Sequence, residues 1–90
     1  MREAEVKVIN PLGLHARAAA QLVRLSATFN STITLHRNDN GGSANAKSIL
    51  SLLALAVPRG TVVRIEVDGH DEELAIGAVE LLFANGFGEL

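Results

Sequence analysis

The sequence predicts an α+β fold in which three helices cover one face of a four-stranded, antiparallel or mixed sheet, in the order βαββαβα. Each strand-like segment alternates apolar and polar residues, which indicates a sheet with one face in the core and the other in water. Each helix-like segment carries apolar residues at helical spacing, and clusters of Gly, Pro and Asn separate the segments. Ninety residues are enough for one core, so residues 1–90 are expected to form one domain.

The N-terminal part of the chain predicts a strand followed by a helix. Residues 5–9 alternate in polarity, which places Val6 and Val8 on the inner face of a strand. A helix over residues 16–28 has a core stripe formed by Ala19, Leu22, Val23 and Ser26. The opposite side of this helix is polar and basic, with Arg17, Gln21, Arg24 and Thr28.

Two further strands are expected to form a hairpin. Residues 32–37 alternate again, with the apolar positions inward and His36 on the solvent side. The sequence Asn-Asp-Asn-Gly-Gly at residues 38–42 is a strong turn signal, and it predicts a short strand near 42–45.

The second helix, expected over residues 47–57, is apolar on two sides. One apolar stripe consists of Ile49, Leu52, Leu53 and Ala56, and the other of Leu50, Leu53, Ala54 and Val57. A helix on a single sheet cannot easily bury both stripes. Either a neighbouring helix covers the second stripe, or this stripe is a small exposed apolar patch of the kind that marks a partner site. Ser48 is expected to be the cap or a first-turn residue of this helix.

The C-terminal part of the chain predicts one more strand and one more helix. Residues 61–68 form the clearest strand, with Val63, Ile65 and Val67 inward. The last helix, over residues 71–84, begins with acidic residues that suit the helix dipole. Its predicted core face is formed by Leu74, Ala75, Ala78, Leu81 and Leu82. Asn85 and Gly86 predict the end of the helix.

Composition argues against several classes of function. A net charge of −2 and an aromatic content of 3% do not fit a nucleic-acid-binding protein. The sequence has no cysteine and only scattered histidines, so neither a metal site nor a cofactor is expected. The charged N-terminus and the absence of a long apolar run argue against a signal segment and against membrane insertion. We expect a cytoplasmic monomer.

The candidate site lies in residues 10–19, which connect a predicted strand to a predicted helix and are centred on His15. Pro11 and Gly13 are typical turn residues, and helical periodicity begins directly after His15, which places it near the N-cap. Unpaired N–H groups and the helix dipole favour an anion there, and they favour a neutral imidazole with one nitrogen free to act as a nucleophile. Arg17 adds a cation that can grip phosphate oxygens. On position alone, a histidine at a loop–helix junction is more often a capping or surface residue than a nucleophile.

Two motifs, Gly13-Leu14-His15-Ala16-Arg17 followed by Ala19-Ala20, and Ala46-Lys47-Ser48-Ile49, resemble the two signatures of the HPr family. These proteins are the histidine-containing phosphocarriers of the bacterial phosphotransferase system. Length and element order match as well, and the implied fold is an open-faced β-sandwich. The resemblance implies that His15 accepts a phosphoryl group on Nδ1 from Enzyme I, which takes it from phosphoenolpyruvate, and passes it to an Enzyme IIA domain. Arg17 would stabilise the phosphate, and the backbone N–H groups of Ala16, Arg17 and Ala18 would cradle it.

The resemblance also implies a docking surface for Enzyme I and Enzyme IIA beside the histidine. Its matching positions are Ala16, Arg17, Ala20, Gln21 and Arg24 on the first helix and Leu50, Ser51, Leu53 and Ala54 on the second. Ser48 matches a serine that an HPr kinase/phosphorylase modifies in some bacterial lineages. A phosphate at this position would favour the helix start but disrupt apolar docking.

Two local features of the chain differ between members of the family that it resembles. Ala18 stands where the family usually has Pro, so the first helical turn keeps an extra N–H and lacks a fixed φ. The tail at residues 83–87 and the turn at 37–39 resemble the nitrogen-related branch of the family more than the sugar-transport branch. The sequence shows no general acid and no nucleotide loop, so we expect a substrate of partner enzymes rather than an independent catalyst.

Two other functions remain open on the sequence. The first is a regulatory binding module that acts by stoichiometric docking, with Ser48 phosphorylation as the switch and His15 phosphorylation dispensable. The second is a ferredoxin-like small-ligand domain that shares the βαββαβ order. Such a domain would have a closed apolar pocket at a subunit interface and a buried His15.

Overall fold

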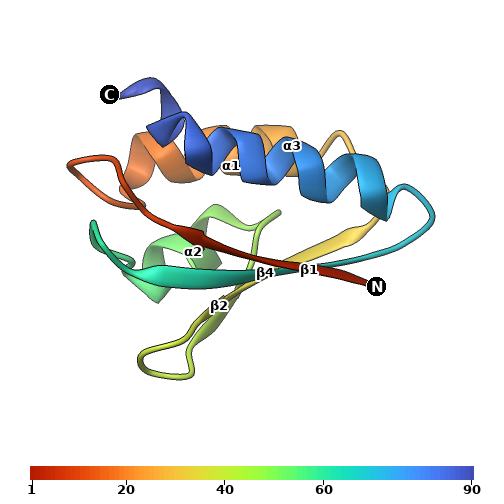
Figure 1. The fold of residues 1–90 in the computed structure, drawn as a ribbon, viewed down its shortest axis with the longest axis horizontal. Helices are drawn as coiled ribbons and strands as arrows, with labels where there is room; N and C mark the ends of the chain where they lie inside the picture. The colour runs from red at the N-terminus through yellow and green to blue at the C-terminus, as the bar shows by residue number, and fades with distance from the viewer.

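A computed structural model describes residues 1–90 as one sheet with three α-helices and a final 3-10 turn (Figure 1). The strands are β1 (Arg2–Lys7), β2 (Thr32–Arg37), β3 (Ser43–Asn45) and β4 (Val62–Asp68). The helices are α1 (Ala16–Ser26), α2 (Ile49–Leu55) and α3 (Glu72–Ala84), and the turn η1 (Gly86–Gly88) follows them. The predicted βαββαβα order is confirmed. None of the helices is both long and apolar enough to cross a lipid bilayer.

The sheet has the strand order β1-β4-β2-β3, and every neighbouring pair is antiparallel. The mixed alternative is therefore excluded. The long strand β4 lies inside the sheet, where it pairs Ile65 with Ala4 of β1 and with Leu35 of β2. Helices α1 and α3 lie side by side over the same face of the sheet (Figure 1). The side chains that reach the core from β2 and β4 are Ile33, Leu35, Val63, Ile65 and Val67.

The first two elements agree with the predicted faces but not with the predicted ends. Strand β1 spans Arg2–Lys7 instead of residues 5–9, because its ladder with β4 supplies hydrogen bonds to polar and apolar residues alike. Val8 is still buried, and its N–H donates to the carbonyl of Thr61 at 2.9 Å. Helix α1 ends at Ser26, two residues before the predicted end, and it buries the predicted stripe except for Val23, which is partly buried.

Helix α2 uses neither of the two predicted apolar stripes as its core face. Leu52 and Leu55 are its buried residues, whereas Ile49, Leu50 and Leu53 are 39%, 77% and 38% exposed. The exposed apolar patch is therefore the correct alternative of the two. We call Ile49, Leu50 and Leu53 the α2 patch.

The early end of α2 explains why its core face differs from the predicted stripes. Ala56 has a left-handed backbone, with φ of 54°, and this ends the helix before the predicted residue 57. The guanidinium of Arg37 donates to the carbonyls of Leu55 and Ala56, at 3.1 and 2.9 Å. These contacts satisfy the last carbonyls of α2 and fix Leu55 over the core.

The predicted core face of α3 is only partly correct, because Ala75 is buried and Ala78 and Leu82 are partly buried, but the outer leucines are not. Leu74 and Leu81 are 73% and 61% exposed, while Ala75, Val79 and Phe83 are buried. The helix is apolar on nearly all sides, so periodicity alone could not select the inner face. Its contacts with β1 and β4 select it instead.

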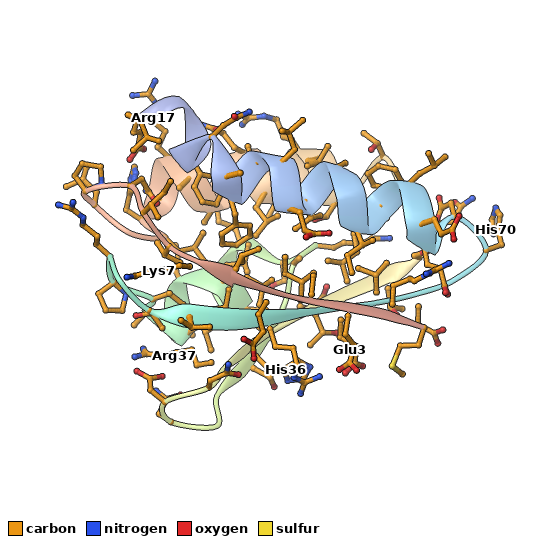
Figure 2. The ribbon with its side chains drawn as sticks, viewed as in Figure 1. Glu3, Lys7, Arg17, His36, Arg37 and His70 are labelled. Atoms are coloured by element: carbon orange, nitrogen blue, oxygen red, sulfur yellow. The ribbon has the colours of Figure 1, made fainter.

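The start of α3 is tied to the loop between α1 and β2. The carboxylate of Asp71 accepts hydrogen bonds from the backbone N–H groups of Asn30 and Ser31, at 2.8 and 3.0 Å, and from the hydroxyl of Ser31. The Ser31 hydroxyl, with the N–H of Asn30 next, lowers the pKa of Asp71 from 3.8 to about 2. This link joins α1, β2 and α3 at the end of the molecule where His70 lies (Figure 2).

The turn before α1 is packed against the loop that follows α2. Gly13 has a φ of +66°, and a Cβ atom at this position would lie 2.4 Å from the carbonyl oxygen of Val57. The next N–H, that of Leu14, donates to the same carbonyl at 2.8 Å. A residue other than glycine cannot make this approach without moving one of the two loops.

We expect Gly13→Ala to destabilise the protein by at least about 2 kcal/mol, because left-handed strain and a backbone clash add together. The matched control is Gly41→Ala. Gly41 has a similar φ of +73° but has no atom within 4 Å of the added Cβ. This control should cost only the strain, about 1 kcal/mol. Urea unfolding of both variants measures the difference, and equal losses would contradict the packing argument.

Candidate functional site

His15 is the N-cap of α1, as predicted. Its backbone is extended, with φ of −79° and ψ of −178°, and its side chain is 24% exposed. The N–H of Arg17 donates to Nδ1 of the ring at 3.3 Å. The Arg17 side chain lies on the surface at the same end of the molecule, away from His36 and His70 (Figure 2). The structure therefore brings the two predicted phosphate-handling side chains together.

The other nitrogen of the ring contacts a residue that the sequence analysis missed. Nε2 of His15 lies 2.5 Å from Oε2 of Glu89, the second-last residue of the chain. The buried Asn10 holds this carboxylate in place, because its amide donates to Oε1 of Glu89 at 3.0 Å and to the carbonyl of Gly13 at 2.7 Å. The site thus joins the turn before α1 to the C-terminal tail.

The tail reaches His15 through a tight turn at η1. Gly86, Phe87 and Gly88 have positive φ values of 59°, 56° and 75°, and these reverse the chain after α3. The Phe87 ring is buried and packs edge-to-face on Phe83, with ring centroids 4.9 Å apart. This aromatic contact anchors the turn, so that Glu89 returns to the start of α1.

The Glu89 carboxylate is kept ionised by its neighbours. Its pKa lies below the usual value, mainly because the Asn10 amide donates to it and further because of the His15 ring and the positive charge of Arg17. An ionised carboxylate can only accept hydrogen bonds. The group that faces it must therefore be a donor.

The two contacts of the ring select the same tautomer of a neutral imidazole. A carboxylate at Nε2 requires a proton on that nitrogen, while an N–H donor at Nδ1 requires a lone pair there. Glu89 and Arg17 together thus place the lone pair of the neutral ring on Nδ1. Because Nδ1 faces the helix entrance, the lone pair lies beside the backbone N–H groups of the first turn.

The first turn of α1 offers N–H groups for an anion next to Nδ1. The N–H groups of Ala16 and Ala18 have no acceptor within the protein, and that of Arg17 is used only by the ring. Ala18 is completely buried, so its side chain does not contribute to the surface around His15. A proline at this position would lose no hydrogen bond of the fold, but it would remove one of these free donors.

The predicted docking residues lie on two helices that contact each other, α1 and α2. Ala16, Arg17, Arg24, Leu50, Leu53 and Ala54 are exposed, and Ala20, Gln21 and Ser51 are partly buried. Ser51 is engaged locally, because its hydroxyl accepts from the N–H of Asn45 at 2.9 Å. Ser48 is the N-cap of α2, and its hydroxyl accepts from the N–H of Ser51 at 3.2 Å.

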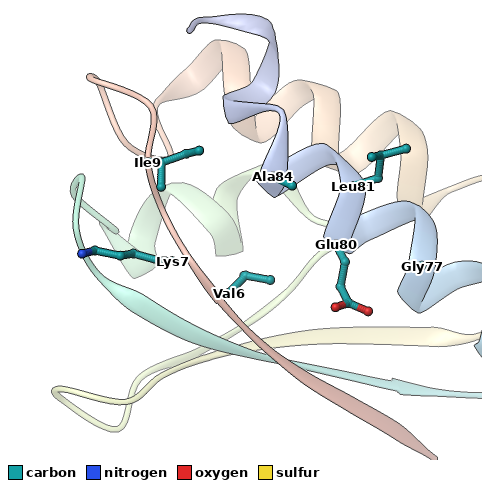
Figure 3. A pocket seen from close by; sticks show the side chains of 7 residues that line it. All are labelled: Val6, Lys7, Ile9, Gly77, Glu80, Leu81 and Ala84. Atoms are coloured by element: carbon teal, nitrogen blue, oxygen red, sulfur yellow. The ribbon is translucent and has the colours of Figure 1, made fainter.

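The largest surface cavity lies elsewhere, between β1 and α3 (Figure 3). Its volume is about 670 Å³, and it is lined by Val6, Lys7, Ile9, Gly77, Glu80, Leu81 and Ala84. None of these residues belongs to the His15 site, and the accessible ring of His15 does not match the buried histidine expected of a small-ligand domain. The candidate site therefore lies at the N-terminus of α1 and not in the largest cavity.

Comparison with known proteins agrees with this geometry. Residues 2–85 match the family model described as "PTS HPr component phosphorylation site". The chain is 47% identical to phosphocarrier protein HPr of Xylella fastidiosa strain Temecula1 over 89 residues, which cover 99% of this chain and 98% of that protein. It is 45% identical to phosphocarrier protein NPr of Proteus mirabilis over 84 residues, with coverages of 93% and 92%. Overall identity therefore does not separate the HPr and NPr types.

The fold is also similar to that of a solved structure. The crystal structure of HPr-C-His from Thermoanaerobacter tengcongensis superposes with a TM-score of 0.92 at 39% identity, and the match covers 100% of this chain and 99% of that one. The matching motifs, the antiparallel sheet with its three helices and the family model all agree. The chain belongs to the HPr family, the histidine-phosphorylated phosphocarriers of the phosphotransferase system.

Proposed function

We propose that His15 is the phosphorylated residue of this carrier and that Nδ1 is the atom that receives the phosphoryl group. The observation that carries the proposal is the tautomer defined by Glu89 at Nε2 and by the Arg17 N–H at Nδ1. A lone pair on Nδ1 is available to attack phosphorus without prior loss of a proton. The nucleophile therefore needs no general base in this chain.

In the transfer step, Nδ1 forms a bond to phosphorus as the bond between phosphorus and the donor breaks. The ring becomes positively charged, and Nε2 keeps its proton against the Glu89 carboxylate. The phosphoryl oxygens meet the free N–H groups of Ala16 and Ala18, and the Arg17 N–H turns from the nitrogen to an oxygen. The Arg17 guanidinium stabilises the remaining charge.

Enzyme I as donor and an Enzyme IIA domain as acceptor are the partners that membership of the family implies. We assign the exchange to the cytoplasm, in sugar uptake or in nitrogen-related regulation. The tail at residues 83–87 and the turn at 37–39 favour the nitrogen-related branch. The carrier acts as a substrate of both partners, since its site holds a nucleophile and an anion cradle and its partners supply the rest of the catalysis.

The docking surface proposed for both partners combines the basic side of α1 with four neighbouring residues of α2. On α1 it includes Ala20, Gln21 and Arg24, and on α2 it includes Leu50, Ser51, Leu53 and Ala54. The apolar side chains would be buried on docking, and Arg24 would face acidic groups of the partner.

Ser48 is proposed as a regulatory phosphorylation site at the edge of this surface. Its hydroxyl caps α2 and its side chain is half-buried, next in sequence to the exposed α2 patch. A phosphate there adds about two negative charges beside side chains that dock by desolvation. Modification by an HPr kinase/phosphorylase would therefore weaken docking while leaving the helix start favourably charged.

Replacement of His15 tests the central proposal. His15→Ala should abolish transfer of labelled phosphate from phosphoenolpyruvate through Enzyme I to the chain. His36→Ala is the matched control, because His36 lies on the open face of the sheet beside Glu66 and should keep full transfer. Undiminished labelling of His15→Ala would reject the carrier proposal and favour a module that acts by docking alone.

Replacement of Glu89 tests how the tautomer is set. In Glu89→Ala, the nitrogen chemical shifts of the His15 ring should show a larger share of the Nδ1–H form, because the acceptor at Nε2 is gone. Glu89→Gln keeps an acceptor oxygen and should stay closer to the wild-type tautomer. Both variants can be measured by ¹⁵N NMR of the ring without any partner present. Identical ring shifts in all three proteins would show that Glu89 does not control the tautomer.

Substitution of two exposed leucines, one inside the proposed docking surface and one outside it, distinguishes an effect on docking from a general effect of changing the surface. Leu50 and Leu74 are 77% and 73% exposed, on α2 and α3 respectively. Leu50→Ser should slow transfer from Enzyme I about tenfold, through loss of about 1.4 kcal/mol of apolar contact. Leu74→Ser should leave the rate unchanged, and both should unfold at similar urea concentrations. Equal rates in the two variants would remove Leu50 from the docking surface.

A further inference from the structure

Two of the eight lysine and arginine side chains make no ion pair or hydrogen bond within the protein and lie outside the face around His15. Three of the others pair with carboxylates, and one donates to a backbone carbonyl; these are Arg2, Arg37, Arg64 and Lys47. Arg17 and Arg24 belong to the face around His15. Lys7 and Arg59 remain, and neither has an ion-pair or side-chain hydrogen-bond partner in the protein.

Lys7 and Arg59 line the same cavity, although they come from different parts of the chain. Lys7 is the last residue of β1, and Arg59 lies in the loop between α2 and β4. The cavity between them has a volume of about 220 Å³, and its other lining residues are Val8, Ile9 and Gly60. The Lys7 side chain extends from β1 toward this loop (Figure 3). No acidic residue lines the cavity, so its two positive charges are not neutralised there.

A second polar cavity lies on the other side of the same loop. Its volume is about 520 Å³, and it is lined by Asn38, Asp39, Arg59, Gly60, Thr61 and Val62. Its only carboxylate, Asp39, is already held by the guanidinium of Arg37 through two hydrogen bonds of 2.9 and 2.7 Å. Arg59 and Gly60 are shared by the two cavities, which therefore flank one short turn.

We propose that Lys7 and Arg59 form a second anion site, which binds the phosphate of a small phosphomonoester whose hydroxyl-bearing remainder lies toward Asn38 and Thr61. Arg59 can bind two phosphate oxygens with its planar fork, and Lys7 supplies a mobile point charge. The smaller cavity has room for a phosphate group, and the larger one offers amide and hydroxyl groups to a polar tail. This site shares no side chain with the His15 cradle.

An NMR titration of the ¹⁵N-labelled full chain at low ionic strength tests the proposal. Inorganic phosphate and glucose 6-phosphate should each shift the backbone amides of Lys7, Arg59 and Gly60 in a saturable way. Glucose 6-phosphate should in addition shift Asn38 and Thr61, and glucose alone should shift none of these amides. The amides of Ala16 and Arg17 report separately on anion binding at the His15 end.

Variants decide whether the two side chains form the site. Lys7→Gln and Arg59→Gln should each raise the dissociation constant for phosphate at Gly60 about tenfold, because each removes a charge-assisted hydrogen bond. Lys47→Gln is the control: it removes the same charge before the start of α2, whereas Arg59 follows the end of that helix.

The outcomes of this experiment are independent of the phosphocarrier proposal. His15→Ala should leave the shifts at Gly60 unchanged, and the two glutamine variants should leave the shifts at Ala16 unchanged. Linear, unsaturable shifts, or equal effects of all three glutamine variants, would show that Lys7 and Arg59 are merely solvated cations and would overturn the proposal.

Discussion

The approach of Gly13 to the loop after α2 is the constraint on which the His15 site depends. Gly13 lies so close to the carbonyl of Val57 that no side chain fits between them, and the same carbonyl accepts the N–H of Leu14. This contact fixes the chain immediately before His15, and so it fixes where α1 begins and where its free N–H groups point. The loop it uses is held in turn by Arg37, which binds the last carbonyls of α2. Direct contacts thus connect strand β2, helix α2 and the turn before His15.

Three distant parts of the chain complete the site around this turn. Asn10 comes from the end of the first strand region, His15 from the start of α1, and Glu89 from the tail. The tail contributes because Phe87 packs on Phe83 and because its flanking glycines tolerate a left-handed backbone. The Glu89 carboxylate contacts both the Asn10 amide and the His15 ring, and the His15 side chain stays 24% exposed. The site is therefore ordered and still open to a partner.

The elements and the position of His15 at the N-cap of α1 could be predicted from the sequence because their signals are local. The alternation of apolar and polar residues predicted the inner faces of β2 and β4, and the turn residues before Ala16 predicted that His15 is the N-cap of α1. The inner face of α3 could not be predicted, because a helix with Leu74 and Leu81 as apolar as Ala75 and Val79 has no unique core side. Leu55 was missed because a left-handed residue ended α2 early. Glu89 was missed because no spacing rule joins residues 74 positions apart; the Gly-Phe-Gly tail was the only hint of a reversal.

The carboxylate beside Nε2 also bears on the return step, in which the phosphoryl group departs. A ring that keeps its Nε2 proton leaves phosphorus as neutral imidazole, whereas a ring without that proton would have to leave as an imidazolate anion, a far poorer leaving group. By accepting from the Nε2 proton, Glu89 would keep the P–N bond of the proposed phosphohistidine weak enough for onward transfer. A residue at the very end of the chain would therefore set the phosphoryl-transfer potential of a bond that forms near its beginning.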